Sequence, residues 1–387
     1  MTALVVFIVV IVASIMIHEA GHFLTARWFG MHAARFFFGF GPTLWSVQRG
    51  ETEYGIKAIP AGGFVKISGM NRYEEVPEDQ EDRAFYAKPA WQRAIVLVAG
   101  CVTHFVLAAV LLFGAMAFFE LPQLRGGEPI TSNEITHVEP DSPAEAAGLR
   151  PGDRVVAVNE TEVSSFDQVR EVVSARPEEQ VTVTFVRGRQ TRTVPVTLSA
   201  RTLDGERIGF IGLASNILAM EDRSVMEAFT GVWVGEYSLP RQTAYALGGI
   251  ARVFTPESIA AWLQQADGDT PRTTDGPISI IGAGQAATAL GRAGAFSSVI
   301  LLLAQFQIVI GTLNLLPLPP FDGGHLAVLG IESGVNAVRR ARGITDEWQV
   351  DPVSLIPLTV AVLLVLGFFA LTAFYVDIVN PVSQLIQ

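Results

Sequence analysis

Four long apolar segments set the pattern of this chain. The first runs from Leu4 to Ile17 without a charged residue. Crossing a bilayer takes about 20 apolar residues, and three later segments come close to that length: residues 94–119, 297–316 and 353–376. The N-terminus lacks the basic region of a secretory signal, and Val12-Ala13-Ser14 is only weakly like a cleavage site, so we expect the first segment to be retained. The pattern predicts four membrane spans.

Between the second and third spans the pattern becomes that of a water-exposed domain. Residues 135–138, 154–159, 181–186 and 191–198 read as strands, residues 166–174 as an amphipathic helix, and a short helix is expected from Ser142 to Gly148. Residues 223–265 look helical but contain glycine and proline breaks, so we expect amphipathic helices outside the membrane or in its interface. The predicted organisation is a membrane core in two parts (1–127 and 276–387), a soluble domain (128–216) and helices with a linker (217–275).

The distribution of basic residues predicts the orientation of the four spans in the membrane. Basic residues follow the first and third spans: Arg27, Arg35, Arg49, Lys57, Lys66, Arg72, Arg83, Lys88 and Arg93 in one loop, and Arg339, Arg340 and Arg342 in the other. The positive-inside rule makes both loops cytoplasmic, with both termini and the middle segment outside. Only 17% of residues are charged, against roughly 25% in soluble proteins, while a net charge of -11 requires a water-exposed part. The single cysteine, Cys101, excludes an intrachain disulfide.

The first cytoplasmic loop is too patterned for a plain linker. Residues 43–48 and 54–59 are predicted strands around a turn at residues 49–52, and residues 63–67 form a further strand-like piece. The run Phe36–Gly41 is too apolar for a solvated loop, and we expect irregular backbone that dips into the membrane interface. Two interpretations stay open: a plain surface hairpin, or an edge strand that pairs with an extended substrate.

The sequence His18-Glu19-Ala20-Gly21-His22 lies at the end of the first apolar run. Two histidines four residues apart share one face of a helix and can bind one Zn²⁺, with Glu19 beside them to accept a proton from water. Asp322, which follows the third span at the same inferred side, is the candidate third ligand. Because charged groups near the bilayer are costly unless paired or metal-bound, a shared site is favoured. The alternative is a set of polar residues that only hydrogen-bond between helices.

These motifs resemble the site-2 protease family of intramembrane zinc metalloproteases. The likeness is strongest to its bacterial branch with one PDZ domain, which controls sigma factors by cleaving anti-sigma factors. The matching sequence motifs are residues 18–22, 39–42, 50–54, 62–66 and 314–325, together with the PDZ-like motifs at residues 147–153 and 158–160. The resemblance covers nearly the whole chain. It implies a polytopic α-helical membrane protein of four spans with a membrane-associated β-hairpin loop and an inserted α+β PDZ domain, in which residues 209–212 would be the peptide-binding loop.

Carried over position by position, the resemblance implies a set of site residues. His18, His22 and Asp322 would hold the zinc, Glu19 would be the general base, and Asn314 would hold the substrate backbone. The segment Gly63, Phe64, Val65, Lys66 and Ile67 would pair with the unwound substrate, and His325 would support Asp322 or its turn.

One position departs from the family pattern. The second span reads Gly100-Cys101-Val102-Thr103-His104 where the family has Gly-Pro-x-x-Asn. His104, counted here with the substrate-binding candidates, could be a hydrogen-bonding stand-in, a partner of a ligand or an extra metal ligand.

The predicted activity is therefore zinc-dependent cleavage of peptide bonds within the transmembrane segments of single-pass proteins, such as anti-sigma factors already trimmed by another protease. We expect a multi-pass protein of the bacterial inner membrane, in contact with lipid and not with nucleic acid. The PDZ domain could bind peptide ends or only filter access. A catalytically silent PDZ adaptor and a membrane zinc-binding or transport protein are the alternatives. A PDZ-linked serine protease is disfavoured because no Gly-x-Ser-Gly-Gly sequence occurs.

Overall fold

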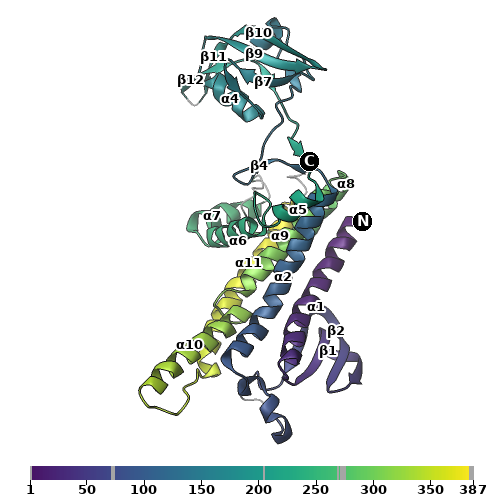
Figure 1. The fold of residues 1–387 in the computed structure, drawn as a ribbon, viewed down its shortest axis with the longest axis vertical. Coiled ribbons are helices and arrows are strands. Elements are labelled where there is room, and N and C mark those ends of the chain that lie inside the picture. Colours follow the sequence, from purple (N-terminus) through teal and green to yellow (C-terminus); the bar gives the residue numbers. More distant parts are fainter. Residues whose placement is uncertain (1, 71–74, 204, 268–269, 271–275, 383–387) are drawn as a thin grey trace. The chain divides into compact units, whose positions relative to one another are not determined.

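The computed structural model describes residues 2–70, 75–203, 205–267, 270 and 276–382, which form two compact units (Figure 1). The first unit, called here the membrane unit, comprises residues 1–115 and 229–387. The second, called the β-rich unit, comprises residues 116–228. Each unit is described by itself.

Four helices among the described residues are long and apolar enough to cross a membrane, by length and composition. They are α1 (Thr2–Trp28), α2 (Ala90–Phe118), α9 (Phe296–Asn314) and α11 (Ile356–Val379). The four predicted segments are thus confirmed as helices. Helix α1 extends to Trp28, well beyond the apolar run that ends at Ile17. Among the other three, the largest shift is in α2, which begins at Ala90 directly after Pro89 and includes Arg93 in its first turn. The charge of Arg93 had suggested a later start.

Two further helices of the membrane unit were not predicted. Helix α8 (Ile280–Arg292) packs against α1 and α9, where Phe7, Ala287 and Leu303 lie in one buried cluster. Helix α10 (Asp322–Ala341) follows the turn after α9. Both helices are amphipathic and rich in glycine or alanine, which weakens their signal beside the longer apolar spans.

The cytoplasmic loop of the prediction is a long antiparallel hairpin of β1 (Ala33–Arg49) and β2 (Thr52–Ile67). The predicted turn is confirmed, since Arg49 pairs with Thr52. The run Phe36–Gly41 lies within β1, so the expectation of irregular backbone there was wrong. Phe36 pairs with Tyr54 on one side and with Val65 on the other, so its polar backbone groups have partners in the sheet. Residues 63–67 therefore form an outer edge of this curled sheet.

The predicted helices within residues 223–265 are confirmed. They are α5 (Val225–Gly231), α6 (Leu239–Val253) and α7 (Pro256–Gln264). In the membrane unit, α7 packs against α11, because the ring of Trp262 stacks on Phe369 with centroids 5.6 Å apart. Short 3-10 turns complete the unit: η1 (Glu78–Arg83), η2 (Phe85–Ala87), η3 (Gln265–Asp267) and η4 (Pro352–Leu355).

The β-rich unit is built on one antiparallel sheet of order β10-β9-β7-β8, with its own core around Val155, Val183 and Phe185. Helix α4 (Phe166–Ser174) covers this core, and α3 (Pro143–Ala146) is capped by Ser142, where the short helix was predicted to start. The predicted strand at 135–138 is shorter than expected. The strands are β3 (Leu121–Pro122), β4 (Leu124–Arg125), β5 (Glu128–Pro129), β6 (His137–Val138), β7 (Arg154–Val158), β8 (Thr161–Glu162), β9 (Gln180–Arg187), β10 (Gln190–Thr197), β11 (Ser199–Leu203), β12 (Glu206–Phe210), β13 (Leu213–Ala214) and β14 (Met220–Glu221).

Candidate metal centre

Three side chains from two distant parts of the sequence converge in the membrane unit. The Nε2 atoms of His18 and His22 lie 3.1 Å apart. Oxygen Oδ2 of Asp322 lies 3.2 Å from the first nitrogen and 3.4 Å from the second. The two histidines are buried and the aspartate is partly buried. The sequence placed these residues at a similar depth, and the fold brings their donor atoms together.

These separations suit one metal ion. Zinc bonds of about 2.0–2.1 Å in tetrahedral geometry put neighbouring donor atoms about 3.3 Å apart. The three measured separations, 3.1, 3.2 and 3.4 Å, bracket that value. Two neutral imidazole nitrogens facing each other at 3.1 Å also need a positive centre or a proton between them. The donor set, two imidazoles and one carboxylate, is one that zinc accepts.

Helix α2 packs against both histidines and forms a hydrogen bond with His22. Nδ1 of His22 lies 2.7 Å from the carbonyl oxygen of Val96, to which it donates, leaving Nε2 free as a donor atom for metal. A β-carbon at Gly21 would lie 2.7 Å from the carbonyl oxygen of Ala99, and one at Gly100 would press on both imidazole rings. Glycine at these two positions therefore lets α1 and α2 approach closely enough for α2 to support the site.

Asp322 is the first residue of α10, where the helix dipole favours a carboxylate. The turn before it folds back tightly over the helix start. A β-carbon at Gly323 would collide with the carbonyl oxygens of Leu315 and Leu316, and one at Gly324 would lie 2.6 Å from the carbonyl carbon of Leu318. The two glycines thus let the turn hold Asp322 against α1. The thiol of Cys101 lies 3.5 Å from the same Oδ2 atom and donates to it.

Glu19 connects this centre to the sheet. Its Oε2 atom accepts a hydrogen bond of 2.9 Å from the backbone N–H of Val65. Since that N–H reaches α1, the outer edge of residues 63–67 faces the candidate site. Gly63 packs close by, because a β-carbon there would lie 2.7 Å from Sδ of Met16 and 3.5 Å from Cγ of Glu19. The open interpretation of a plain surface hairpin does not describe this packing.

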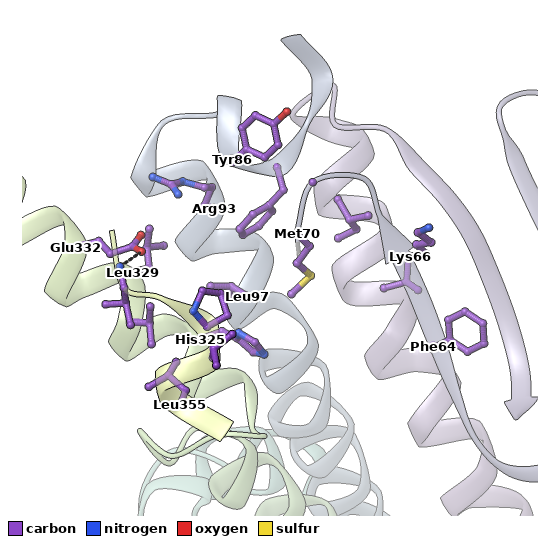
Figure 2. A pocket seen from close by; sticks show the side chains of 18 of the residues that line it. Phe64, Lys66, Met70, Tyr86, Arg93, Leu97, His325, Leu329, Glu332 and Leu355 are labelled. Carbon is purple, nitrogen blue, oxygen red and sulfur yellow. Dashed lines mark hydrogen bonds between the residues drawn. The ribbon is translucent and has the colours of Figure 1, made fainter. Parts of the chain in front are cut away.

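A cavity of about 880 Å³ lies along the same strand edge. Figure 2 shows Phe64 and Lys66 of β2 on one side of it, Leu329 and Glu332 of α10 on the other, and His325 between them. The wall at Glu332 is completed by the segment before α11, since Val350 N–H donates to Glu332 at 3.0 Å. The cavity is mostly apolar, and residues 64–67 of β2 border it.

The tip of the hairpin is tied down by charge. Arg83 donates hydrogen bonds of 2.7 and 2.9 Å to the carboxylate of Glu51. This guanidinium holds the pKa of the Glu51 carboxyl below its usual range. The pair joins the hairpin to the loop that leads into α2.

The remaining predicted site residues fall into two groups. His104 lies beside the metal-binding candidates, with its ring centroid 5.0 Å from that of His18. Asn314 is the last residue of α9 and half-buried, and His325 lines the cavity rather than joining the three donor atoms. In the β-rich unit, Gly209 ends up in β12 and Gly212, at φ +81°, follows that strand.

Sequence reasoning missed several residues of this neighbourhood. Gln307 of α9 lies 2.8 Å from Nδ1 of His104, and its only signal was a polar side chain inside an apolar span. The backbone oxygen of Val96 and the need for glycine at position 100 had no sequence signal, because both depend on how α1 and α2 cross.

Long apolar helices that carry a His–His–Asp cluster with an adjacent glutamate define a membrane metallopeptidase class. Comparison with known proteins agrees: residues 6–345 match peptidase family M50. The chain belongs to this family, the site-2 protease family, and the expected class, a zinc metalloprotease, is confirmed.

The relatives match along nearly the whole chain. "Zinc metalloprotease Rip1" of Mycobacterium tuberculosis is 34% identical over 403 residues, covering 98% of both chains. Its namesake in Mycolicibacterium smegmatis is 35% identical over 404 residues with the same coverage. "Putative zinc metalloprotease all3971" of Nostoc sp. is 32% identical over 332 residues, covering 84% of this chain and 85% of that protein. Among solved structures, a PDZ domain of an SdrC-like protein from Listeria monocytogenes aligns with 23% of this chain and 92% of its own, at 16% identity and a TM-score of 0.20.

Proposed function

We propose that this zinc metalloprotease cleaves peptide bonds within the transmembrane segments of single-pass membrane proteins of the anti-sigma-factor type. The observation that carries the proposal is the position of the donor atoms along α1. Counted from Leu4, His18 lies about 21 Å and His22 about 27 Å along the helix, at 1.5 Å per residue. Both values fall within the roughly 30 Å of a bilayer core. A peptide bond that reaches this site is therefore below the membrane surface.

In this proposal, His18, His22 and Asp322 hold the zinc ion. When bound, zinc polarises the scissile carbonyl and makes water a stronger nucleophile. Glu19 follows His18 directly in α1, and its carboxylate accepts the proton of the attacking water and passes it to the leaving amine. The hydrogen bond from Val65 N–H keeps this carboxylate turned toward the strand edge where the substrate is expected. An intact Glu19 argues against a catalytically silent adaptor.

The substrate must be extended before it is cut, because the carbonyl groups of a helix are hydrogen-bonded and shielded. The outer edge of Gly63, Phe64, Val65, Lys66 and Ile67 offers main-chain groups for strand addition. We place the substrate along this edge, with the bordering cavity taking the side chains on one side of the cut. Asn314 at the end of α9 would hold the substrate backbone, and His104 stays a candidate contact.

The proposed setting is the bacterial inner membrane. In the membrane unit, the hairpin and α10 lie at the end of the helices where the basic residues gather (Figure 1). The positive-inside rule makes this end cytoplasmic, so the site opens toward the cytoplasm and both termini lie outside. The proposed domain boundaries lie after residues 127, 216 and 275, which separate the two parts of the membrane core from the soluble domain and the helices that follow it.

We propose that residues 128–216 form an extracytoplasmic PDZ domain. The support is local: Gly148, in the PDZ-like motif at residues 147–153, ends the turn after α3 at φ +76°. Ser142 caps α3, and the predicted β9–β10 hairpin turns at Gly188. Its role is either to bind peptide ends or to exclude substrates whose outer domain has not been removed.

The test is the Glu19→Gln variant, reconstituted with a purified single-pass reporter. We expect zinc content to stay at the wild-type level and cleavage to fall about 10²–10⁴-fold, the usual contribution of a general base. Mass spectrometry of the products gives the position of the cut. Glu78→Gln, an exposed position in η1, is the matched control and keeps full cleavage. Unchanged cleavage in Glu19→Gln, or a cut outside the transmembrane segment, contradicts the proposal.

A further inference from the structure

The two metal-binding histidines are not held in the same way. His22 has its second ring nitrogen fixed by the carbonyl oxygen of Val96 at 2.7 Å. Nδ1 of His18 is buried and, within the described part of the chain, has no hydrogen-bond partner. Metal-binding histidines almost always donate this second N–H to a carboxylate, a carbonyl or water, which sets the orientation of the ring. No hydrogen bond from the described residues therefore orients the His18 ring.

The ring of His104 occupies the position to do so. Its centroid lies 5.0 Å from that of His18, with an angle of 40° between the planes. The other ring against His18 is that of His22, at 4.7 Å and 81°. The His18 imidazole thus contacts two rings, one from its own helix and one from α2. A contact of this kind limits rotation about the side-chain bonds of His18.

His104 is itself held in place from α9. Its Nδ1 atom lies 2.8 Å from Oε1 of Gln307, and the two residues are 2% and 0% exposed. One turn further along α9, Gly311 leaves room for the side chain of His104, since a β-carbon there would lie 3.0 Å from its Cβ. Gln307 and Gly311 therefore form a seat on α9 for a residue of α2. An asparagine at position 104 has no ring to reach His18.

We propose that His104, locked by Gln307, is a positioning residue that orients His18 for zinc binding. The inference rests on the proposed assignment of His18 as a zinc ligand. Of the three roles left open for His104, this one makes it a partner of a ligand. The donor atoms that gather within 4.8 Å among the described residues are those of His18, His22 and Asp322 and do not include His104. Because no described residue holds His18 by a hydrogen bond, contact with the His104 ring is left to set its orientation.

The test compares His104→Asn with His104→Phe in the full-length protein. Phenylalanine keeps a ring against His18 and loses the hydrogen bond, whereas asparagine keeps an amide and loses the ring. We expect zinc to bind about 10–100-fold more weakly to His104→Asn, as for other partners of metal-binding histidines, and within about threefold of wild type to His104→Phe. Competition with a chromophoric chelator gives the zinc dissociation constant. The visible spectrum of the Co²⁺-loaded protein should change in His104→Asn and be preserved in His104→Phe.

Gln307→Leu removes the hydrogen bond that holds His104 and should weaken zinc binding by less than His104→Asn does. Val102→Ala, a half-exposed position on the same helix, is the control for changes in α2. The melting temperature of the zinc-free protein shows whether any variant has lost its fold. Equal zinc affinity in the wild type and His104→Asn overturns the inference, as does an equal loss in the asparagine and phenylalanine variants. Zinc binding is measured without a substrate, so absence of intramembrane cleavage would contradict the proposed function alone.

Discussion

Gly100→Ala is the sharpest perturbation of the candidate metal centre, because it adds one methyl group from the opposite helix. The new β-carbon would contact Nε2 of His22 and would lie 2.7 Å from Cε1 of His22 and 2.8 Å from Cε1 of His18. Ordinary carbon–carbon contacts are about 3.5–4.0 Å. Both imidazole rings, or the whole of α2, must therefore move by about 1 Å.

A shift of that size is large for a metal site. Functional groups are held within about 0.5 Å of the productive geometry, and a displacement of 1 Å can cost about a hundredfold in rate. Overpacking a tight interior also costs about 1–3 kcal/mol of stability. We expect Gly100→Ala to bind zinc at least about tenfold more weakly and to cleave a transmembrane reporter about a hundredfold more slowly.

The assay is zinc affinity by chelator competition, followed by cleavage at saturating zinc. Gly114→Ala is the matched control, since it lies on the same helix and a β-carbon there would meet nothing within 4 Å. Alanine is favoured over glycine in a helix, so this variant should be as active as wild type and slightly more stable. Wild-type zinc affinity in Gly100→Ala would show that α2 does not support the histidines as described.

Three other perturbations test separate parts of the structure. Val65→Pro removes the N–H that donates to Glu19, and a hydrogen bond to a charged group is worth about 1.5–3 kcal/mol. The value of kcat/KM should therefore fall about 10–100-fold at unchanged zinc content. An unaltered kcat/KM would contradict the strand-edge arrangement. Chelation of zinc should destabilise the membrane unit, by about 4 kcal/mol where zinc had been present at a thousand times its dissociation constant, and should leave amide exchange in the β-rich unit unchanged. In that unit, burial raises the pKa of Asp153, but the Arg187 guanidinium and the Arg150 N–H lower it more, to below its usual range. Stability from this group is present above about pH 4 and is lost as pH falls further, so amide exchange in the unit should speed up there in the wild type and depend less on pH in Arg187→Gln.

Local sequence patterns predicted much of the secondary structure of this protein. The apolar runs predicted four spans, and the alternation of apolar and polar residues predicted the hairpin turn, α4 and the β9–β10 pair. The prediction was wrong for Phe36–Gly41, where a strand had been expected to be irregular backbone. Its partners on both sides come from residues up to 29 positions away, and such pairing leaves no mark in the local pattern.

The sequence by itself determined the chemistry: two histidines on one helical face, a glutamate beside them, an aspartate after the third span, and an apolar setting for all of them. These follow from the period of the α-helix and from the cost of bare charge in lipid, which are both local properties. Only the tertiary structure decided that the donor atoms meet at 3.1–3.4 Å and that Gly100 must be small. It also decided that Val65 faces Glu19 and that Gln307 holds His104. Those distances arise from the crossing of helices and strands far apart in the chain, and packing alone fixes them.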